Sequence, residues 1–413
     1  MAPERTPAVV IGVQLPGVDD SVHAASLQEL TRLGKTLGLQ VVERVAQKRS
    51  ALAPGAVLGE GKLEELAARV NELSVRTVLV DHEITPSQAR NLEKATSAEV
   101  LDRTAVILAI FQRHARSREA RLQVEIARLS YLAPRLRESS AGRDRQGGGI
   151  GGKGAGESAI ELDRRKLRDR ISELRQELSA IERDAETRRR RRTEASTVAL
   201  VGYTNAGKSS LMRALTGSGV LVADQLFATL DTTVRALQPP THPRILISDT
   251  VGFIKKLPHD LIASFRSTLD EVRDASLLVQ VVDASDPAHQ AQMDVTREVL
   301  REIGADAQPW LVVLNKIDRV DVATRAELEA LHPDALLLSA KRPEDVALLR
   351  DRLVAFFERE MVEDEVTVPY SRQRVVGDIH SSCRVLAETY DERGTHLRIR
   401  AHPAVLARLR AAL

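Results

Sequence analysis

The chain has 413 residues, of which 43% are hydrophobic and 29% charged, a composition typical of a soluble globular protein with about two to four domains. Its single cysteine, Cys383, excludes an internal disulfide framework and a zinc site built from cysteines. The first residues lack the pattern of a signal peptide and no apolar run approaches the roughly 18 residues of a membrane span, so we expect a cytoplasmic protein.

The N-terminal region alternates between strand-like and helix-like segments, which predicts a small parallel α/β domain over residues 1–95. The strands predicted from short apolar runs are Ala8–Val13, Val41–Val45 and Thr77–Asp81. The helices predicted from helical spacing are Ser26–Leu37, Lys62–Leu73 and Pro86–Lys94. The turn Gly59–Lys62 could present N–H groups to an anion, but so short a motif more often marks a plain turn.

Residues 96–195 are predicted to form a helical hairpin. Helices are predicted over about Arg103–Leu132, with Pro134 as the terminator, and over about Ser158–Arg192. Apolar residues of the second helix recur at spacings of four and three, which is a coiled-coil seam that requires a partner. The seam residues are Leu167, Ile171, Leu174, Leu178, Ile181 and Ala185. The first helix is the obvious partner, in an antiparallel pair with the Gly-rich residues 147–157 at its tip.

Positive charge is concentrated in this hairpin. Between Arg103 and Glu194 there are 23 Lys or Arg residues and 14 Asp or Glu residues, although the formal net charge of the whole chain is only +2. This excess favours a polyanionic partner such as RNA, and the alternative is a solvated rod laced with ion pairs. The Gly-rich tip contains Ile150, Lys153 and Glu157 rather than the serines of a flexible linker, which favours contact with RNA.

Residues 196–360 alternate regularly between strands and helices, which predicts a doubly wound α/β domain. The predicted strands are Val198–Val201, Ile245–Ser248, Leu277–Val282, Leu311–Leu314 and Ala335–Leu338. The predicted helices are Ser209–Leu215, Leu261–Val272, Ala291–Ile303 and Thr324–Leu331. Residues 361–413 predict a strand, a helix, two strands and a last helix, a small α+β domain to which we assign no chemistry.

A complete phosphate-binding loop, or P-loop, follows the first strand of this domain: Gly202-Tyr203-Thr204-Asn205-Ala206-Gly207-Lys208-Ser209. Its glycines allow successive N–H groups to turn inward around phosphate oxygens, and the following helix N-terminus favours negative charge. We expect Lys208 to reach the β- and γ-phosphates and the Ser209 hydroxyl to ligate Mg²⁺. The loop therefore predicts a nucleoside triphosphate site without identifying the base.

The base is predicted by Asn315-Lys316-Ile317-Asp318, which follows an apolar strand. The Asp318 carboxylate can accept hydrogen bonds from guanine N1–H and the exocyclic amine, whereas adenine would leave that charge unpaired. We expect Asn315 to tie this loop to the P-loop, and the Lys316 stem to cover the base. Backbone N–H groups of Ser339-Ala340-Lys341, after the next strand, could contact guanine O6.

A γ-phosphate sensor is predicted at Asp249-Thr250-Val251-Gly252. Asp249 should act on Mg²⁺ through a water, and the Gly252 N–H should bond the γ-phosphate until it is hydrolysed. Between the P-loop and this sensor lies Phe227-Ala228-Thr229-Leu230-Asp231-Thr232-Thr233-Val234. One threonine of this segment should reach Mg²⁺ and the γ-phosphate, and spacing alone permits Thr229, Thr232 or Thr233.

Phe253 follows the sensor glycine, close to the point where Ras-like enzymes place a glutamine that orients the attacking water. A phenylalanine side chain cannot form a hydrogen bond with water. We therefore expect slow intrinsic GTP hydrolysis and stimulation by a partner that completes the site.

The chain resembles the HflX family of GTPases over essentially its whole length. The resemblance rests on the P-loop, on Ala223–Asp231 and on Asp249–Phe253, with its hydrophobic substitution for the catalytic glutamine. Upstream it rests on four shorter segments, which are Asp102-Arg-Thr, Gln123-Val-Glu, Gly156-Glu157 and Glu161-Leu-Asp-Arg-Arg165.

The resemblance implies that the protein binds the large ribosomal subunit, is stimulated there, and splits or rescues stalled ribosomes under stress. It implies that the Gly-rich loop of the hairpin points towards the peptidyl-transferase region. It also assigns the Mg²⁺-binding threonine to Thr229. The expected catalytic groups are then Lys208, Thr229 and Gly252, with Ser209 and Thr229 as metal ligands. Some members are said to bind ATP through the N-terminal domain, for which Gly59–Lys62 is the one candidate.

The sequence is also compatible with two other functions. One is a GTPase that controls RNA modification or ribosome assembly, although we find no second catalytic constellation in the sequence. The other is a GTP-dependent binding module without useful hydrolysis, which Phe253 permits but which the presence of Lys208, Ser209 and Asp249 disfavours. We expect a monomer.

Overall fold

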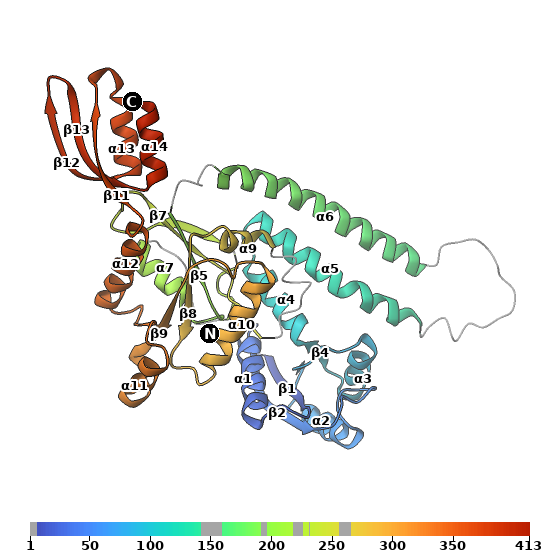
Figure 1. Cartoon of the computed structure of the whole chain (residues 1–413). Coiled ribbons are helices and arrows are strands. Elements are labelled where there is room, and N and C mark those ends of the chain that lie inside the picture. The colour runs from blue at the N-terminus through green and yellow to red at the C-terminus, as the bar shows by residue number, and fades with distance from the viewer. Residues whose placement is uncertain (1–5, 142–158, 191–195, 218–225, 231, 256–265) are drawn as a thin grey trace, which may run out of the picture. The chain divides into compact units, whose positions relative to one another are not determined.

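The computed structural model describes residues 6–141, 159–190, 196–217, 226–230, 232–255 and 266–413 (Figure 1). The chain divides into two compact units. The first comprises residues 1–185, 224–230 and 256–266, and the second comprises residues 186–223, 231–255 and 267–413. Within the described part of the chain, no helix is long and apolar enough to cross a membrane.

The N-terminal part of the first unit is a parallel sheet with the strand order β2-β1-β3-β4. Its strands are β1 (Thr6–Gln14), β2 (Leu39–Lys48), β3 (Thr77–Val80) and β4 (Glu99–Asp102), and its helices are α1 (Asp20–Thr36), α2 (Glu60–Glu72) and α3 (Pro86–Thr96). The predicted parallel α/β domain is confirmed. Strand β4 was missed because only its two central residues, Val100 and Leu101, are apolar, and it carries the sheet beyond residue 95, where we had placed the domain boundary.

The long helix predicted over Arg103–Leu132 is wrong in two respects. The chain forms two helices there, α4 (Arg103–His114) and α5 (Arg118–Ala141). The second begins after Ser117 because this hydroxyl accepts a backbone N–H three residues on, at 3.0 Å, as helix-capping serines do. Pro134 lies inside α5 and does not end it.

Contacts with the sheet hold α5 on both sides of Pro134. The Tyr131 hydroxyl donates to Asp102 Oδ1 at 2.8 Å, and the Arg135 guanidinium donates to Asp102 Oδ2 at 2.6 Å. Arg135 also lies 3.5 Å from the centroid of the Tyr131 ring and donates to the Ile84 carbonyl at 3.1 Å. These bonds offset the helical hydrogen bond that proline cannot form, and they anchor the hairpin to the end of β4.

The predicted hairpin is confirmed within the described residues. Helix α6 (Ala159–Arg190) runs back alongside α5 (Figure 1). Its seam packs on α5 through residues that are buried or partly buried: Leu122, Ile126 and Leu129 of α5, with Leu167, Ile171, Leu174, Leu178 and Ile181 of α6. The Gly-rich residues 147–157 lie outside the described residues, as do Arg191 and Arg192.

The second unit contains the predicted doubly wound sheet, with the strand order β10-β9-β8-β5-β7-β6. Its strands are β5 (Ser196–Val201), β6 (Thr233–Ala236), β7 (Ile245–Asp249), β8 (Leu277–Asp283), β9 (Trp310–Asn315) and β10 (Leu336–Leu337). Its helices are α7 (Lys208–Thr216), α9 (Arg266–Arg273), α10 (His289–Glu302), α11 (Val322–Leu331) and α12 (Pro343–Glu358). All pairs are parallel except β6 with β7, and neither β6 nor α12 was predicted. The carboxyl ends of the parallel strands meet at one edge, where such sheets bind ligands.

The C-terminal residues form an antiparallel sheet in the order β11-β13-β12. The elements are β11 (Val362–Val368), α13 (Arg374–Ser382), β12 (Arg384–Asp391), β13 (Gly394–Ala401) and α14 (Pro403–Ala412), which confirms the predicted order. Cys383 is fully buried in the core of this domain beside Ile379. Burial raises the pKa of its thiol, so it is an apolar core residue rather than a reactive group.

Candidate functional site

The P-loop connects β5 to α7, as its sequence predicts. Gly202 and Gly207 have φ angles of +143° and +99°, which favour glycine. A Cβ atom on Gly202 would lie 2.1 Å from the carbonyl oxygen of Val281 on the adjacent strand β8. A Cβ atom on Gly207 would lie 2.2 Å from Asn315 Nδ2. Both glycines are therefore required for the loop to fit against β8 and β9.

Lys208 is buried at the first position of α7. Its ammonium group donates to the carbonyl oxygens of Gly202 and Tyr203 at 3.0 and 2.9 Å, so the side chain folds back over the loop. Burial lowers the pKa of Lys208 to about 8, against an opposing effect of the Asp249 carboxylate. The amine is therefore held where phosphate oxygens would be bound, in an environment that penalises its charge.

Nucleotide affinity is expected to depend on the charge of Lys208. Phosphate oxygens favour the ammonium form, so nucleotide binding raises a pKa that is about 8 in this structure. The affinity for GTP should be constant below about pH 8 and fall by up to tenfold per pH unit above it. Fluorescence titrations with a labelled guanine nucleotide at a series of pH values would measure this, and an affinity unchanged above pH 8 would contradict it.

Ser209 and Asp249 meet at the proposed metal position. The Ser209 hydroxyl donates to Asp249 Oδ2 at 2.6 Å, and the Asp249 side chain is fully buried at the end of β7. A hydroxyl and a carboxylate side by side supply the oxygen ligands that Mg²⁺ prefers. The residues present therefore fit the expected cation.

The sensor segment lies directly against the P-loop. The Thr204 N–H donates to the Phe253 carbonyl at 2.7 Å, and the Phe253 N–H donates to the Gly202 carbonyl at 3.1 Å. A Cβ atom on Gly252 would lie 2.6 Å from Thr204 Cα. The Phe253 side chain is only 2% exposed. Phe253 is thus a core side chain whose backbone pairs with the P-loop, and it cannot guide a water molecule.

The two inner residues of the sensor are also held in place. The Thr250 hydroxyl donates to the Leu200 carbonyl on β5 at 2.7 Å, and Val251 is buried. The backbone N–H of Lys255 donates to the Tyr203 hydroxyl at 2.7 Å. Movement of the sensor therefore requires that its bonds to the P-loop break.

The predicted guanine-binding segments come together at the ends of β9 and β10. Asn315 Nδ2 donates to the Ala206 carbonyl at 2.9 Å, which confirms the predicted tie to the P-loop. The Ser339 hydroxyl donates to Asp318 Oδ1 at 2.7 Å and lowers the pKa of this carboxyl, while Ile317 is buried beneath the loop. Asp318 therefore stays ionised as a hydrogen-bond acceptor at neutral pH.

The N–H groups after β10 donate to side chains of the protein in this structure. The Ser339 N–H donates to Asp345 at 2.7 Å, and the Ala340 N–H donates to Asn315 Oδ1 at 3.1 Å. The Lys341 ammonium lies 3.3 Å from Asp318 Oδ2. Their contact with guanine O6 stays a prediction.

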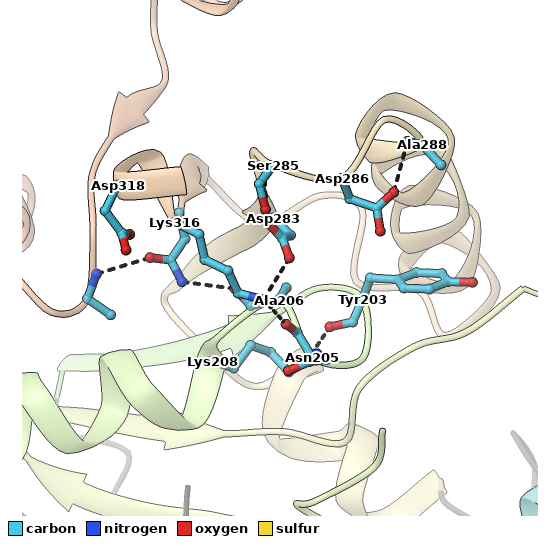
Figure 2. A network of polar contacts seen from close by, with 12 residues as sticks. Tyr203, Asn205, Ala206, Lys208, Asp283, Ser285, Asp286, Ala288, Lys316 and Asp318 are labelled. Carbon is cyan, nitrogen blue, oxygen red and sulfur yellow. Dashed lines mark hydrogen bonds and ion pairs between the residues drawn. The ribbon is translucent and has the colours of Figure 1, made fainter. Parts of the chain in front are cut away.

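Asp283, at the end of β8, was missed by the sequence analysis. Figure 2 shows it beside Lys316, whose ammonium group lies 2.6 Å from Asp283 Oδ2. The available signal was its position, because carboxyl ends of neighbouring parallel strands meet at one edge of the sheet.

The segment with the expected metal-binding threonine belongs to the first unit, whereas the P-loop belongs to the second. The Phe227 ring contacts the Phe111 ring of α4 edge-on, with the centroids 4.8 Å apart. The Phe227 carbonyl lies 2.7 Å from Nδ1 of His114. Leu230 is buried, Thr229 is partly buried, and Asp231 lies outside the described residues. The role of Thr229 as a metal ligand beside Ser209 therefore stays a prediction.

Matches to three known protein families together span most of the chain. Residues 24–112 match the family described as GTP-binding GTPase N-terminal, and residues 114–192 match the GTP-binding GTPase middle region. Residues 197–316 match the family described as 50S ribosome-binding GTPase.

Among similar proteins, the GTPase HflX of Gluconacetobacter diazotrophicus is 58% identical over 98% of this chain and 97% of its own length. The GTPase HflX of Escherichia coli is 39% identical over 89% of this chain and 88% of its own length. A solved structure of a GTP-binding protein from Sulfolobus solfataricus in complex with GDP is 26% identical, covers 85% of this chain and 98% of its own, and has a TM-score of 0.45.

Proposed function

The chain belongs to the HflX family of GTPases and is a GTP hydrolase, and from this premise we propose that it acts on the large ribosomal subunit. The observation that supports this partner is the basic hairpin. Helix α6 has exposed cationic side chains along its described length: Arg165, Lys166, Arg168, Arg170 and Arg175. A rod of this charge suits the phosphate backbone of ribosomal RNA.

Part of this charge is compensated within the helix. Arg170 pairs with Glu173 at 2.6 Å and Lys166 lies 3.8 Å from Asp163, as in a solvated rod. Arg168 and Arg175 have no ion-pair partner within the described part of the chain. These two exposed arginines are therefore candidates for contact with RNA phosphates.

The hydrolytic role of each group follows from its position. Lys208 and the inward N–H groups of the P-loop bind phosphate oxygens, while the Gly252 N–H senses the γ-phosphate. Ser209 and Thr229 would hold Mg²⁺ and Asp249 would act on it through a water, and the ion would supply positive charge at the β- and γ-phosphates. Phe253 leaves the attacking water without a guide, so we propose that the ribosome supplies or positions the group that orients it.

We further propose that GTP hydrolysis accompanies the splitting or rescue of stalled ribosomes. The support is that two backbone hydrogen bonds join Phe253, next to the sensor, to the P-loop, so that a γ-phosphate contact at Gly252 can act on both segments and control a conformational change. Sucrose-gradient profiles of stalled 70S ribosomes test this. The proposal expects conversion to free subunits with GTP and none with GDP, and unchanged profiles with GTP would contradict it.

Substitution of the unpaired hairpin arginines is expected to weaken binding to the large subunit. The double variant Arg168→Glu/Arg175→Glu should lose about tenfold or more in affinity at moderate salt, because two phosphate contacts become repulsive. Co-sedimentation with separated subunits in the presence of a non-hydrolysable GTP analogue measures the affinity. Arg352→Glu/Arg359→Glu, at exposed positions in α12 and directly after it, makes the same change in net charge and should bind normally.

The same sedimentation assay tests the tip of the hairpin. Deletion of residues 147–156 should weaken binding to the large subunit and spare basal hydrolysis, because the nucleotide site lies elsewhere in the sequence. Full affinity in this deletion would show that the Gly-rich segment is only a linker.

A further inference from the structure

Asp283, Lys316 and the backbone carbonyl of Asn205 meet at the base side of the nucleotide site (Figure 2). The Lys316 ammonium donates to Asp283 Oδ2 at 2.6 Å and to the carbonyl of Asn205 in the P-loop at 2.7 Å. Both charged side chains are largely buried, at 16% and 15% exposed. A pair so shielded from water has a well-defined geometry and holds its partners more firmly than a surface ion pair.

Asp283 is itself held in place from the other side. Its Oδ1 atom accepts hydrogen bonds from the Ser285 N–H at 3.1 Å and the Ser285 hydroxyl at 2.6 Å. Oδ2 is therefore left facing Lys316, so the carboxylate acts as a fixed anchor at the end of β8. The anchor determines where the Lys316 side chain lies.

The lysine in turn fixes the outer side of the P-loop. Carbonyl oxygens of Asn205 and Ala206, which are consecutive, accept from Lys316 and from Asn315. When carbonyl groups of a loop point outward, its N–H groups are free to point inward to an anion. The pair Asp283–Lys316 thus holds the Lys316 stem where it is expected to cover the base, and it also supports the shape of the P-loop.

Lys316 needs a counter-charge at this place. Lys316 lies close enough to Lys208 that its charge helps to lower the pKa of Lys208, and two cations share the P-loop. Without a carboxylate, the Lys316 ammonium would be repelled and would gain more by moving to water. Its methylene stem would then leave the plane that it is expected to cover.

We propose that Asp283 is a positioning residue for guanine nucleotides, which acts by holding Lys316 across the base and against the P-loop. In this role Asp283 makes no contact with the reacting phosphate. Its loss is therefore expected to weaken binding of GTP and GDP by the same factor and to leave kcat at saturating GTP unchanged.

The direct test is Asp283→Asn, which keeps the shape of the side chain and removes its charge. The Kd values of GTP and GDP should both rise about tenfold, with KM following and kcat within twofold of the parent. Asp286→Asn is the matched control, because Asp286 lies three residues on and accepts the Ala288 N–H at 2.9 Å without contacting Lys316 (Figure 2). This control should change neither Kd nor kcat.

A double-mutant cycle separates positioning from a general loss of structure. Lys316→Met keeps an apolar stem and removes the ammonium group, and the double variant Asp283→Asn/Lys316→Met has no unpaired charge to destabilise the fold. If Asp283 acts through Lys316, the double variant binds GTP no more weakly than Lys316→Met alone. Additive losses, a fall in kcat at unchanged Kd, or unequal effects on GTP and GDP would overturn the proposal.

Discussion

Replacement of Asp318 by asparagine is expected to lower kcat/KM for GTP on the order of 10³-fold and to make xanthosine triphosphate the better substrate. The carboxylate is a pure acceptor, matched to guanine N1–H and the exocyclic amine. The Ser339 hydroxyl donates a hydrogen bond of 2.7 Å to this carboxylate, which keeps it ionised and oriented. An asparagine NH₂ group would face the guanine amine donor to donor, but it can donate to the oxygen that xanthine carries there.

The measurement is a comparison of hydrolysis rates for the two triphosphates with the parent and with Asp318→Asn. Asp321→Asn is the control, since Asp321 lies on the same loop and caps α11 through the Thr324 N–H at 2.9 Å. It can lower stability but should keep the parent's preference for GTP. Unchanged base preference in Asp318→Asn would refute the assignment of the guanine pocket.

Replacement of Lys208 by methionine is expected to lower the single-turnover rate of GTP hydrolysis on the order of 10³-fold. This variant loses the positive charge at the phosphates and not the recognition of the base. The ammonium group is the cation that the P-loop brings to the β- and γ-phosphates. Arg213→Met, at an exposed position on the same helix α7, should hydrolyse GTP like the parent. A rate for Lys208→Met within tenfold of the parent would contradict the assigned role.

The same variant should be more stable than the parent without nucleotide. The pKa of Lys208 is lowered from 10.5 to about 8, so the folded chain binds this proton more weakly than the unfolded chain does. The cost of burying the charge is fully present below pH 8 and amounts to about 3 kcal/mol. It declines as the pH rises from 8 towards 10.5. Unfolding experiments at pH 7 and 10 should show the stability gain of Lys208→Met shrink.

The nucleotide motifs could be predicted because their chemistry is local in sequence. Gly202–Ser209 and Asn315–Asp318 each follow a buried strand, and the sheet brings these ends together. Asp283 could not be found in the same way, since it belongs to no recognised motif and its partner Lys316 is 33 residues away. The end of the first hairpin helix could not be predicted from the sequence either. Proline usually ends a helix, but at Pro134 the hydrogen bonds from Tyr131 and Arg135 to Asp102 of the sheet keep α5 helical.

Long-range contacts also decided where the Thr229 segment lies. Sequence order placed it in the GTPase domain, between the P-loop and the sensor. In the structure, Phe227 contacts Phe111 and His114, which are more than a hundred residues earlier, so the segment belongs to the first unit. No periodicity or motif encodes such a contact, and the role of Thr229 as a metal ligand stays a prediction.

We propose that the large ribosomal subunit completes the catalytic site of this GTP hydrolase. The most direct measurement is the steady-state rate of GTP hydrolysis by the full chain, alone and with purified large subunits or small subunits added. We expect slow turnover alone, because Phe253 is buried and cannot orient water, and a rise of about tenfold or more with large subunits only. A rate that large subunits leave at the basal level would contradict it.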